Sequence, residues 1–262
     1  MAFTASDVKK LRDATGLGMM DCKKALEKAE GDFDKAAEIV RAEFGAKMDS
    51  RADRESTEGQ IAIAVQGDKG VIVQVNTETD FTAKNDAFVA MTKQIADMAL
   101  QQDAGTVAVT DQIEAAMKEV RLTTGENIQF GSGTVYAGGA IGSYIHFTGK
   151  IGVLIQLDGD ADEVLCKDLC MHISAIVPAA LGVNDEDIPA DVVETEKGHA
   201  KAEAIESGKP EEIAEKMVIG KMRKYMDSVV LLRQPFVKDD KQQIKDILPA
   251  GVSIKAFTKL SI

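Results

Sequence analysis

Apolar residues near the N-terminus recur at the spacing of three short amphipathic helices. Glycine-bearing turns at residues 15–18 and at Gly31 separate these helices, because glycine readily ends a helix. We therefore expect a three-helix domain over residues 1–46, followed by a charged linker without apolar period over residues 47–58. The residues expected to form its small core are Val8, Leu11, Cys22, Ala25, Leu26, Ala29, Phe33, Ala36, Ala37, Val40 and Phe44.

From residue 59 the pattern changes to the alternation that is typical of β-strands. Branched apolar residues alternate with small or polar ones over residues 61–65, and a turn leads into an apolar run at residues 71–75. The elements expected after this hairpin are helices over residues 83–100 and 110–124 and a strand over residues 128–137. Together they predict a first core subdomain over residues 59–139.

A second hairpin over residues 141–157 precedes another helical pattern at residues 162–176. A shift of 82 residues (153 − 71) places Val71 opposite Val153, inside apolar runs of similar composition. One strand–strand–helix unit cannot bury its apolar face alone, whereas two copies facing each other share a core. We therefore predict an α+β fold with a duplicated hairpin–helix core and antiparallel sheets, whose second subdomain covers residues 140–262.

Two largely polar helical segments are inserted into this second subdomain at about residues 185–229. Pro210 follows a turn between them and suits the first position of the second helix. The pattern predicts an antiparallel helical hairpin that projects from the body of the protein. A short helix over residues 242–248 and a strand over residues 252–260 are expected to complete the subdomain.

One strand-to-helix corner stands out, because Phe81 follows Asp80 where an apolar run turns polar. Phe81 lies seven residues before Phe88, so it could extend the apolar stripe of the following helix by one turn. Alternatively, it is presented to a partner. The shift of 82 residues places Glu163 opposite Phe81, which indicates that the fold does not require an aromatic residue there.

The amino-acid composition disfavours several classes of function. The 262 residues carry a formal net charge of −12, which disfavours a nucleic-acid partner because phosphate backbones repel such a chain. No run of eighteen apolar residues predicts a membrane span, and the N-terminus does not resemble a signal peptide. Three cysteines are an odd number and predict no disulfide framework, so we expect a protein of the reducing cytosol.

Candidate catalytic chemistry is sparse. The histidines are His146, His172 and His199, and none stands near a serine or cysteine in a nucleophile motif. Cys166 and Cys170 lie one helical turn apart, but a buried thiol pair explains this spacing better than a metal site that includes His172. We therefore expect neither an enzyme nor a metal protein.

The glycine-rich stretches match neither a phosphate-binding loop nor a dinucleotide-binding motif, so we expect no bound nucleotide or other cofactor. Met19 and Met20 follow a glycine loop and precede Lys23. These residues form either an adaptable contact surface or a solvated lysine face over a methionine-filled core.

Several long motifs, in order along nearly the whole chain, resemble bacterial elongation factor Ts. The matching segments are residues 15–26 (TGLGMMDCKKAL), 78–85 (ETDFTAKN), 142–146 (GSYIH), 171–173 (MHI), 207–217 (SGKPEEIAEKM) and 234–237 (QPFV). The resemblance implies a UBA-like N-terminal domain, a coiled-coil hairpin, and a non-enzymatic guanine-nucleotide exchange factor for elongation factor Tu. It also implies that GDP is bound by the partner.

The resemblance carries over a set of contact residues. The corner would enter the partner beside the nucleotide and disturb its Mg²⁺ and phosphate site. We accordingly expect Phe81 to be at least partly exposed and Asp80 to hold the turn. Both should face the same side as Met19, Met20 and Lys23. The remaining implied contacts are Met19, Met20, Lys23, Gly125 and His146, beside Thr79, Asp80, Phe81 and Thr82 at the corner itself.

The chain departs from the family pattern in three places. Thr124 stands where an apolar residue is common, and Phe147 stands where glycine is common, so the contacts of Gly125 and His146 are expected to be altered. The sequence ends at Ile262, where many members continue into a further helical module.

Two other functions remain as alternatives. The helical N-terminal unit is also compatible with a chaperone or adaptor that uses the same exposed contacts. An enzyme with a site between the two core copies would require a deep polar cleft with perturbed carboxylates.

Overall fold

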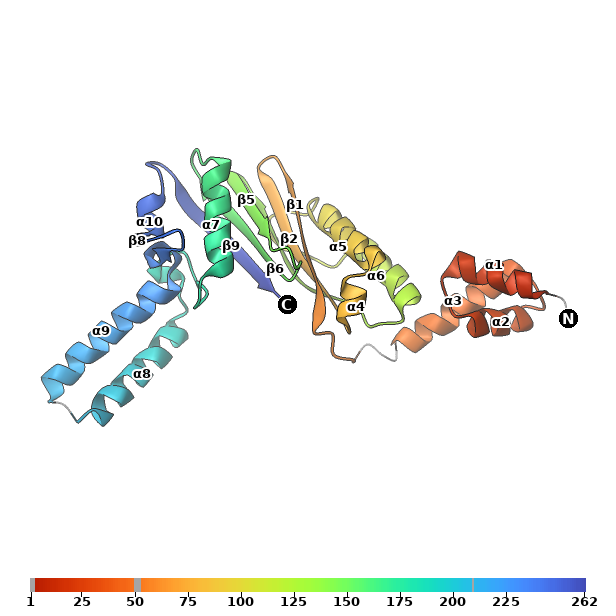
Figure 1. The fold of residues 1–262 in the computed structure, drawn as a ribbon, viewed down its shortest axis with the longest axis horizontal. Coiled ribbons are helices and arrows are strands. Elements are labelled where there is room, and N and C mark those ends of the chain that lie inside the picture. The colour runs from red at the N-terminus through yellow and green to blue at the C-terminus, as the bar shows by residue number, and fades with distance from the viewer. Residues whose placement is uncertain (1–2, 50–52, 209) are drawn as a thin grey trace. The chain divides into compact units, whose positions relative to one another are not determined.

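The computed structural model describes residues 3–49, 53–208 and 210–262, and it combines helices with antiparallel strands in an α+β fold (Figure 1). The chain divides into two compact units. The first consists of Met1–Ala64, Val71–Val135 and Ser261–Ile262, and the second consists of Val65–Gly70 and Tyr136–Leu260. The domain boundaries expected from the sequence stay predictions.

The N-terminal segment forms α1 (Ala5–Thr15), α2 (Met19–Lys28) and α3 (Phe33–Asp49). A reciprocal capping box begins α1, because Thr4 and Asp7 each accept a hydrogen bond from the other's backbone amide. α3 continues past the predicted end at Phe44, because residues 45–49 keep the helical conformation instead of starting a linker. Residues 50–52 of the predicted linker lie outside the described residues. The buried core includes Leu11, Leu17, Cys22, Ala25, Leu26, Ala36 and Val40.

The first core sheet has the strand order β1-β2-β4-β3, and α5 and α6 cover it. Alternate residues of β2, namely Val71, Val73 and Val75, pack against α5 through Phe88 and Ile95. The two-residue strand β3 was not predicted, because it is too short to show a period and exists through its antiparallel pairing with β4. The bounds are β1 Glu58–Gln66, β2 Lys69–Thr77, β3 Gly105–Thr106, β4 Gln129–Ala137, α5 Asp86–Ala99 and α6 Asp111–Thr124.

The second sheet has the order β5-β6-β9, with α7 packed on β5 and β6. β5 pairs with β6 in antiparallel register from Ala140↔Leu157 to Ile145↔Gly152. β2 starts at Lys69 and β6 starts 82 residues later at Ile151, the spacing on which the repeat was predicted. The bounds are β5 Ala140–Ile145, β6 Ile151–Asp158, α7 Glu163–Ala175 and β9 Ser253–Ser261.

Two long helices of the second unit, α8 (Ala190–Glu206) and α9 (Glu211–Val229), lie side by side (Figure 1). Ala200 and Ala204 are buried, and Lys221 of α9 pairs with Glu203 of α8. Pro210 is the residue that caps α9 rather than its first helical residue. The remaining elements are the 3-10 turns η1 (Asp185–Asp187) and η2 (Leu231–Arg233), the hairpin β7 (Pro235–Phe236) and β8 (Asp239–Gln243), and α10 (Ile244–Ile247).

The β7–β8 hairpin corrects the sequence analysis, which predicted a helix over residues 242–248. Residues 239–243 pair with β7 instead, and the helix shrinks to α10. Within residues 3–49, 53–208 and 210–262, no helix has the length and apolar character needed to cross a bilayer.

A buried polar network joins α7 to the segment after α9. The backbone amide of Val237 donates to Nδ1 of His172 (3.4 Å), so Nε2 carries the ring proton and donates to Oε1 of Gln234 (3.1 Å). The side-chain amide of Gln234 then donates to the carbonyl oxygens of Ser228 and Pro178. Because both ring nitrogens of His172 form hydrogen bonds within the fold, the role of this histidine is structural.

This network predicts a pH dependence of stability. Burial lowers the pKa of His172, and the hydrogen bond that the ring donates to Gln234 opposes the shift. The unfolded chain takes up a proton below about pH 6.5, where folded His172 stays neutral, so stability should fall as the pH drops below that value. We expect the free energy of unfolding, measured by urea titration, to fall by roughly 1 kcal/mol between about pH 7.5 and pH 5.5.

His172→Gln should reduce that decrease, although it weakens the fold at both pH values. His199→Gln, which changes an exposed histidine of α8, should retain the decrease. An equal pH slope in wild type and His172→Gln would contradict the assignment.

Candidate partner-binding site

The Phe81 corner, residues 78–85, connects β2 to α5 through the one-turn helix α4 (Asp80–Ala83). The helix predicted over residues 83–100 is present as α5 (Asp86–Ala99), but it begins three residues later than predicted, because the chain breaks at Lys84 and Asn85. The side chain of Asn85 accepts a hydrogen bond from the amide of Ala87 (2.9 Å) and so begins α5 separately. The hydroxyl of Thr79 accepts from the amide of Thr82 (3.4 Å) and begins α4.

The helix break decides the environment of Phe81. Phe88 is buried on the stripe of α5 with an exposed fraction of 0%, whereas Phe81 is 83% exposed. Since α4 and α5 are separate helices, the spacing of seven residues no longer places the two rings on one face. Thr82 and Ala83 are the residues of α4 that face the interior. The core-packing interpretation of Phe81 is therefore wrong, and the expectation that Phe81 is exposed is confirmed.

Asp80 stabilises the same turn from outside. Its Oδ2 accepts a hydrogen bond from Nζ of Lys84 at 2.8 Å, across one helical turn. The hydrogen bond and the charge of Asp80 together raise the pKa of Lys84. Both side chains are exposed to solvent, so water and salt screen the ion pair.

The side chain of Glu126, which is distant in the sequence, accepts hydrogen bonds from the Phe81 corner. Oε2 of Glu126 accepts hydrogen bonds from the backbone amide of Thr79 (3.0 Å) and the hydroxyl of Thr77 (2.8 Å), while Oε1 accepts from the hydroxyl of Thr79 (2.6 Å). Burial raises the pKa of Glu126, but the hydrogen bonds from these threonines outweigh it and leave the pKa below its ordinary value. Sequence reasoning missed Glu126, whose partners lie 47 and 49 residues earlier.

The neighbouring residues add hydrogen bonds in the opposite direction, from the turn after α6 (residues 125–127) to the Phe81 corner. We call this reciprocal set of hydrogen bonds the lock. Oε1 of Glu78 accepts from the backbone amide of Asn127 (2.8 Å), and its Oε2 pairs with Arg54 (3.3 Å). The side-chain amide of Asn127 donates to the carbonyl oxygen of Arg54 (2.8 Å). Each turn therefore supplies an acidic side chain to the backbone of the other.

Gly125 places Glu126 under the corner. It ends α6 in the left-handed conformation (φ 73°), which other residues adopt at a cost, so the backbone explains why glycine stands here. The hydroxyl of Thr124 donates to the carbonyl oxygen of Val120 (2.8 Å) and accepts from the amide of Glu126 (3.4 Å). A polar residue before the glycine is thus satisfied locally.

The predicted contact residues of α2 lie at its exposed beginning. Met19 and Met20 are 46% and 61% exposed, so they do not fill the core as the alternative interpretation required. Lys23 lies one turn further and approaches Glu27 at 3.8 Å. These three side chains share a helix face because of their spacing. That they face the same side as Phe81 stays a prediction.

His146 belongs to the second unit, in the turn between β5 and β6. Its Nδ1 lies 2.9 Å from the hydroxyl of Thr148, and its ring centroid lies 4.3 Å from that of Phe147. Phe147 is 92% exposed, so the residue that departs from the family pattern adds an apolar surface beside the histidine.

Metal and nucleophile chemistry has little support in the described segments. Burial is the main factor that raises the pKa of both Cys166 and Cys170, which keeps the thiols protonated and poor nucleophiles. Among residues 3–49, 53–208 and 210–262, no cluster of three or more histidine, cysteine or acidic side chains has the arrangement of a metal site.

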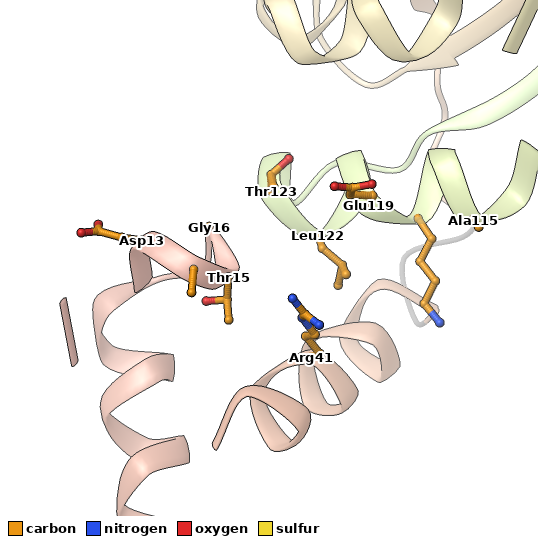
Figure 2. Close-up of a pocket in the computed structure, with 10 residues that line it drawn as sticks. Asp13, Thr15, Gly16, Arg41, Ala115, Glu119, Leu122 and Thr123 are labelled. Atoms are coloured by element: carbon orange, nitrogen blue, oxygen red, sulfur yellow. The ribbon is translucent and has the colours of Figure 1, made fainter. Parts of the chain in front are cut away.

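A groove of about 640 Å³ in the first unit is shown in Figure 2. Leu122 of α6 packs against the apolar core of α1–α3 at this place. Acidic and basic side chains both line the groove, so its charge does not favour one class of ligand. The lining residues include Asp13, Gly16, Arg41, Lys118, Glu119, Leu122 and Thr123.

Comparison with known proteins decides the family. Residues 78–262, which begin at the Phe81 corner, match the model of the family described as Elongation factor TS. The chain belongs to the elongation factor Ts family. Elongation factor Ts of Cupriavidus necator is 42% identical over 98% of this chain and 89% of its own length. The Methylobacillus flagellatus protein of the same name is 43% identical over 98% of this chain and 90% of its own length.

Elongation factor Ts of Alkalilimnicola ehrlichii is 40% identical over 100% of this chain and 92% of its own length. The resemblance found in the sequence motifs is therefore confirmed. Membership of the elongation factor Ts family assigns this chain to the translation elongation factors.

Phe81 and Phe88 should differ sharply in their contributions to stability. Phe88→Ala removes a fully buried ring and should lower the free energy of unfolding by about 3–5 kcal/mol. Phe81→Ala removes an exposed ring and should change it by less than about 0.5 kcal/mol. Urea unfolding of both variants beside wild type measures this, and a large loss for Phe81→Ala would contradict the exposed placement.

Proposed function

We propose that this chain is a guanine-nucleotide exchange factor, which binds elongation factor Tu in its GDP-bound form and accelerates the release of GDP. GTP then binds again, and the partner returns to translation elongation. GDP would be bound by the partner and not by this chain. The observation that supports this most is the side chain of Phe81, which is 83% exposed on a turn held by a half-buried carboxylate.

An exposed aromatic side chain on a fixed turn suits the role of a wedge. Aromatic residues are frequent anchors in protein interfaces, because they bury much area with few rotatable bonds. In the proposed complex, Asp80 and Phe81 enter the partner beside the nucleotide and disturb its Mg²⁺ site. A bound Mg²⁺ joins phosphate oxygens to the protein, so its displacement weakens the hold on the diphosphate. The action is protein–protein binding and needs no proton transfer by this chain.

The other proposed contacts follow from the family resemblance, and of these Met19, Met20 and Lys23 are also exposed. Thr79 and Thr82 flank the wedge within α4 and its cap. Met19 and Met20 offer adaptable apolar surface beside the charge of Lys23. Gly125 and His146 complete the proposed set of partner contacts.

We also propose a domain organisation for this function. α1–α3 form a UBA-like module, α8 and α9 form an antiparallel coiled-coil hairpin, and the two core subdomains cover residues 59–139 and 140–262. The buried Ala200 and Ala204 support close packing of the hairpin helices. The proposed place of action is the cytoplasm, where translation elongation occurs.

The proposal is tested by the release of a fluorescent GDP analogue from elongation factor Tu. Wild type should accelerate release, and Phe81→Ala should reduce the acceleration by about thirtyfold, the effect of losing an interface anchor worth about 2 kcal/mol. The exposed ring carries little stability, so the fold should persist in this variant.

Val164→Ala is the matched control, because Val164 is also exposed at the start of the helix that follows the hairpin in the second copy. It should retain full acceleration. If Phe81→Ala exchanges as fast as wild type, the wedge is wrong. If wild type binds the partner without accelerating release, the adaptor function replaces the proposed one.

Linkage supplies an independent prediction. If this chain weakens GDP binding to the partner by some factor, GDP must weaken binding of this chain by the same factor. Titration calorimetry of wild type against nucleotide-free and GDP-saturated partner should give a ratio of affinities that equals the ratio of GDP affinities with and without this chain. If this chain binds both forms of the partner with the same affinity, the chain and GDP do not compete, and the proposed exchange is contradicted.

A further inference from the structure

We propose that Glu126 is a positioning residue for exchange, which holds α4 in place so that Phe81 is presented in one orientation. This inference rests on the proposed function and adds a residue that does not itself belong to the proposed contact surface. It is carried by hydrogen bonds that join the end of α6 to the Phe81 corner.

The first step concerns the direction of one hydrogen bond. An ionised carboxylate only accepts hydrogen bonds, so the hydroxyl of Thr79 must donate its single proton to Oε1 of Glu126 (2.6 Å). The lone pairs of that hydroxyl are then free to accept from the amide of Thr82 (3.4 Å). Glu126 therefore orients the side chain that begins α4.

The second step concerns what else holds the turn. α4 spans only Asp80–Ala83, and so short a helix is unstable alone. The side chain of Gln60 donates to the carbonyl oxygen of Ala83 (3.0 Å) and so holds the end of α4. The Asp80–Lys84 ion pair is exposed and screened, so it contributes little. The bonds to Glu126 are partly buried and charge-assisted, which makes them stronger than neutral hydrogen bonds. They also reach the backbone of Thr79, directly before α4.

The third step compares the two copies of the core. In the second copy, Asp162 caps α7 with its own side chain, which accepts from the amide of Leu165 (2.8 Å). A carboxylate from the helix's own cap is thus sufficient to begin a helix after the hairpin. In the first copy the cap is Thr79, and the carboxylate comes from the turn after α6. This arrangement ties the orientation of the corner to a second element.

The test uses Glu126→Gln, which keeps the shape but replaces one accepting oxygen with a donating amide. Glu119→Gln is the matched control, because it makes the same charge change at an exposed position of α6. Unfolding midpoints of both variants establish that they fold.

The first readout is amide hydrogen exchange, followed by NMR in the free protein. Glu126→Gln should speed exchange at Thr82, Ala83 and Lys84 by about tenfold, since their amides bond within the Thr79 turn. The amide of Ala87, capped by Asn85, should keep its wild-type rate. Unchanged rates at all of these amides would overturn the proposal.

The second readout is a double-mutant cycle on GDP release. In the wild-type background, Glu126→Gln should reduce the acceleration of GDP release about tenfold. In the Phe81→Ala background the reduction should be less than about twofold, because Glu126 acts through Phe81. Equal losses in both backgrounds would show a general structural role and overturn the proposal.

The two readouts separate this inference from the proposed function. If wild type does not accelerate GDP release, the proposed function fails and the exchange role of Glu126 fails with it. Amide exchange still decides whether Glu126 holds the corner. If Glu126→Gln does not fold, Thr77→Val removes one donor to the same carboxylate and should speed exchange at the same amides by a smaller factor.

Discussion

The half-buried carboxylate of Glu126 is the interaction on which the arrangement of the Phe81 corner depends. It accepts hydrogen bonds from Thr77 and Thr79, 47 to 49 residues earlier, and so joins the end of β2 to the end of α6. The reverse bond from the amide of Asn127 to Glu78 closes the lock. Because each turn satisfies polar groups of the other, neither can move without leaving a partly buried donor or acceptor unpaired.

This lock allows an apolar side chain to remain outside the core. Phe88 stabilises the fold through its burial, whereas the exposed ring of Phe81 gains no such stabilisation. Packing of its own ring therefore does not fix the position of Phe81. Ordering comes instead from the residues beside it, since Thr82 and Ala83 are buried and Thr79 is hydrogen-bonded. A preorganised anchor loses less conformational entropy when it enters a partner, which suits the proposed wedge.

The two copies of the hairpin–helix unit illustrate how one framework serves different purposes. Their strands β2 and β6 begin 82 residues apart and bury similar apolar runs. The following helix is continuous in the second copy and interrupted in the first, where Asn85 starts α5 anew. The interruption turns Phe81 away from the stripe that Phe88 occupies. The corner is thus a local departure from a shared framework.

The sequence by itself determined the regular elements and the family. The apolar pattern located α6, α7, β4 and β6 closely, because α6, α7 and β4 each bury one face along their own length and β6 is a continuous buried run. Tertiary structure decided the rest. β3 and the β7–β8 hairpin are too short to show a period and form through pairing with other segments. Glu126 gave no signal in its local pattern, because its meaning depends on threonines far away in the chain. The spacing of Phe81 alone was compatible with burial, and its exposure was predicted only from the family resemblance. The helix break gives the physical reason, because it removes Phe81 from the buried stripe.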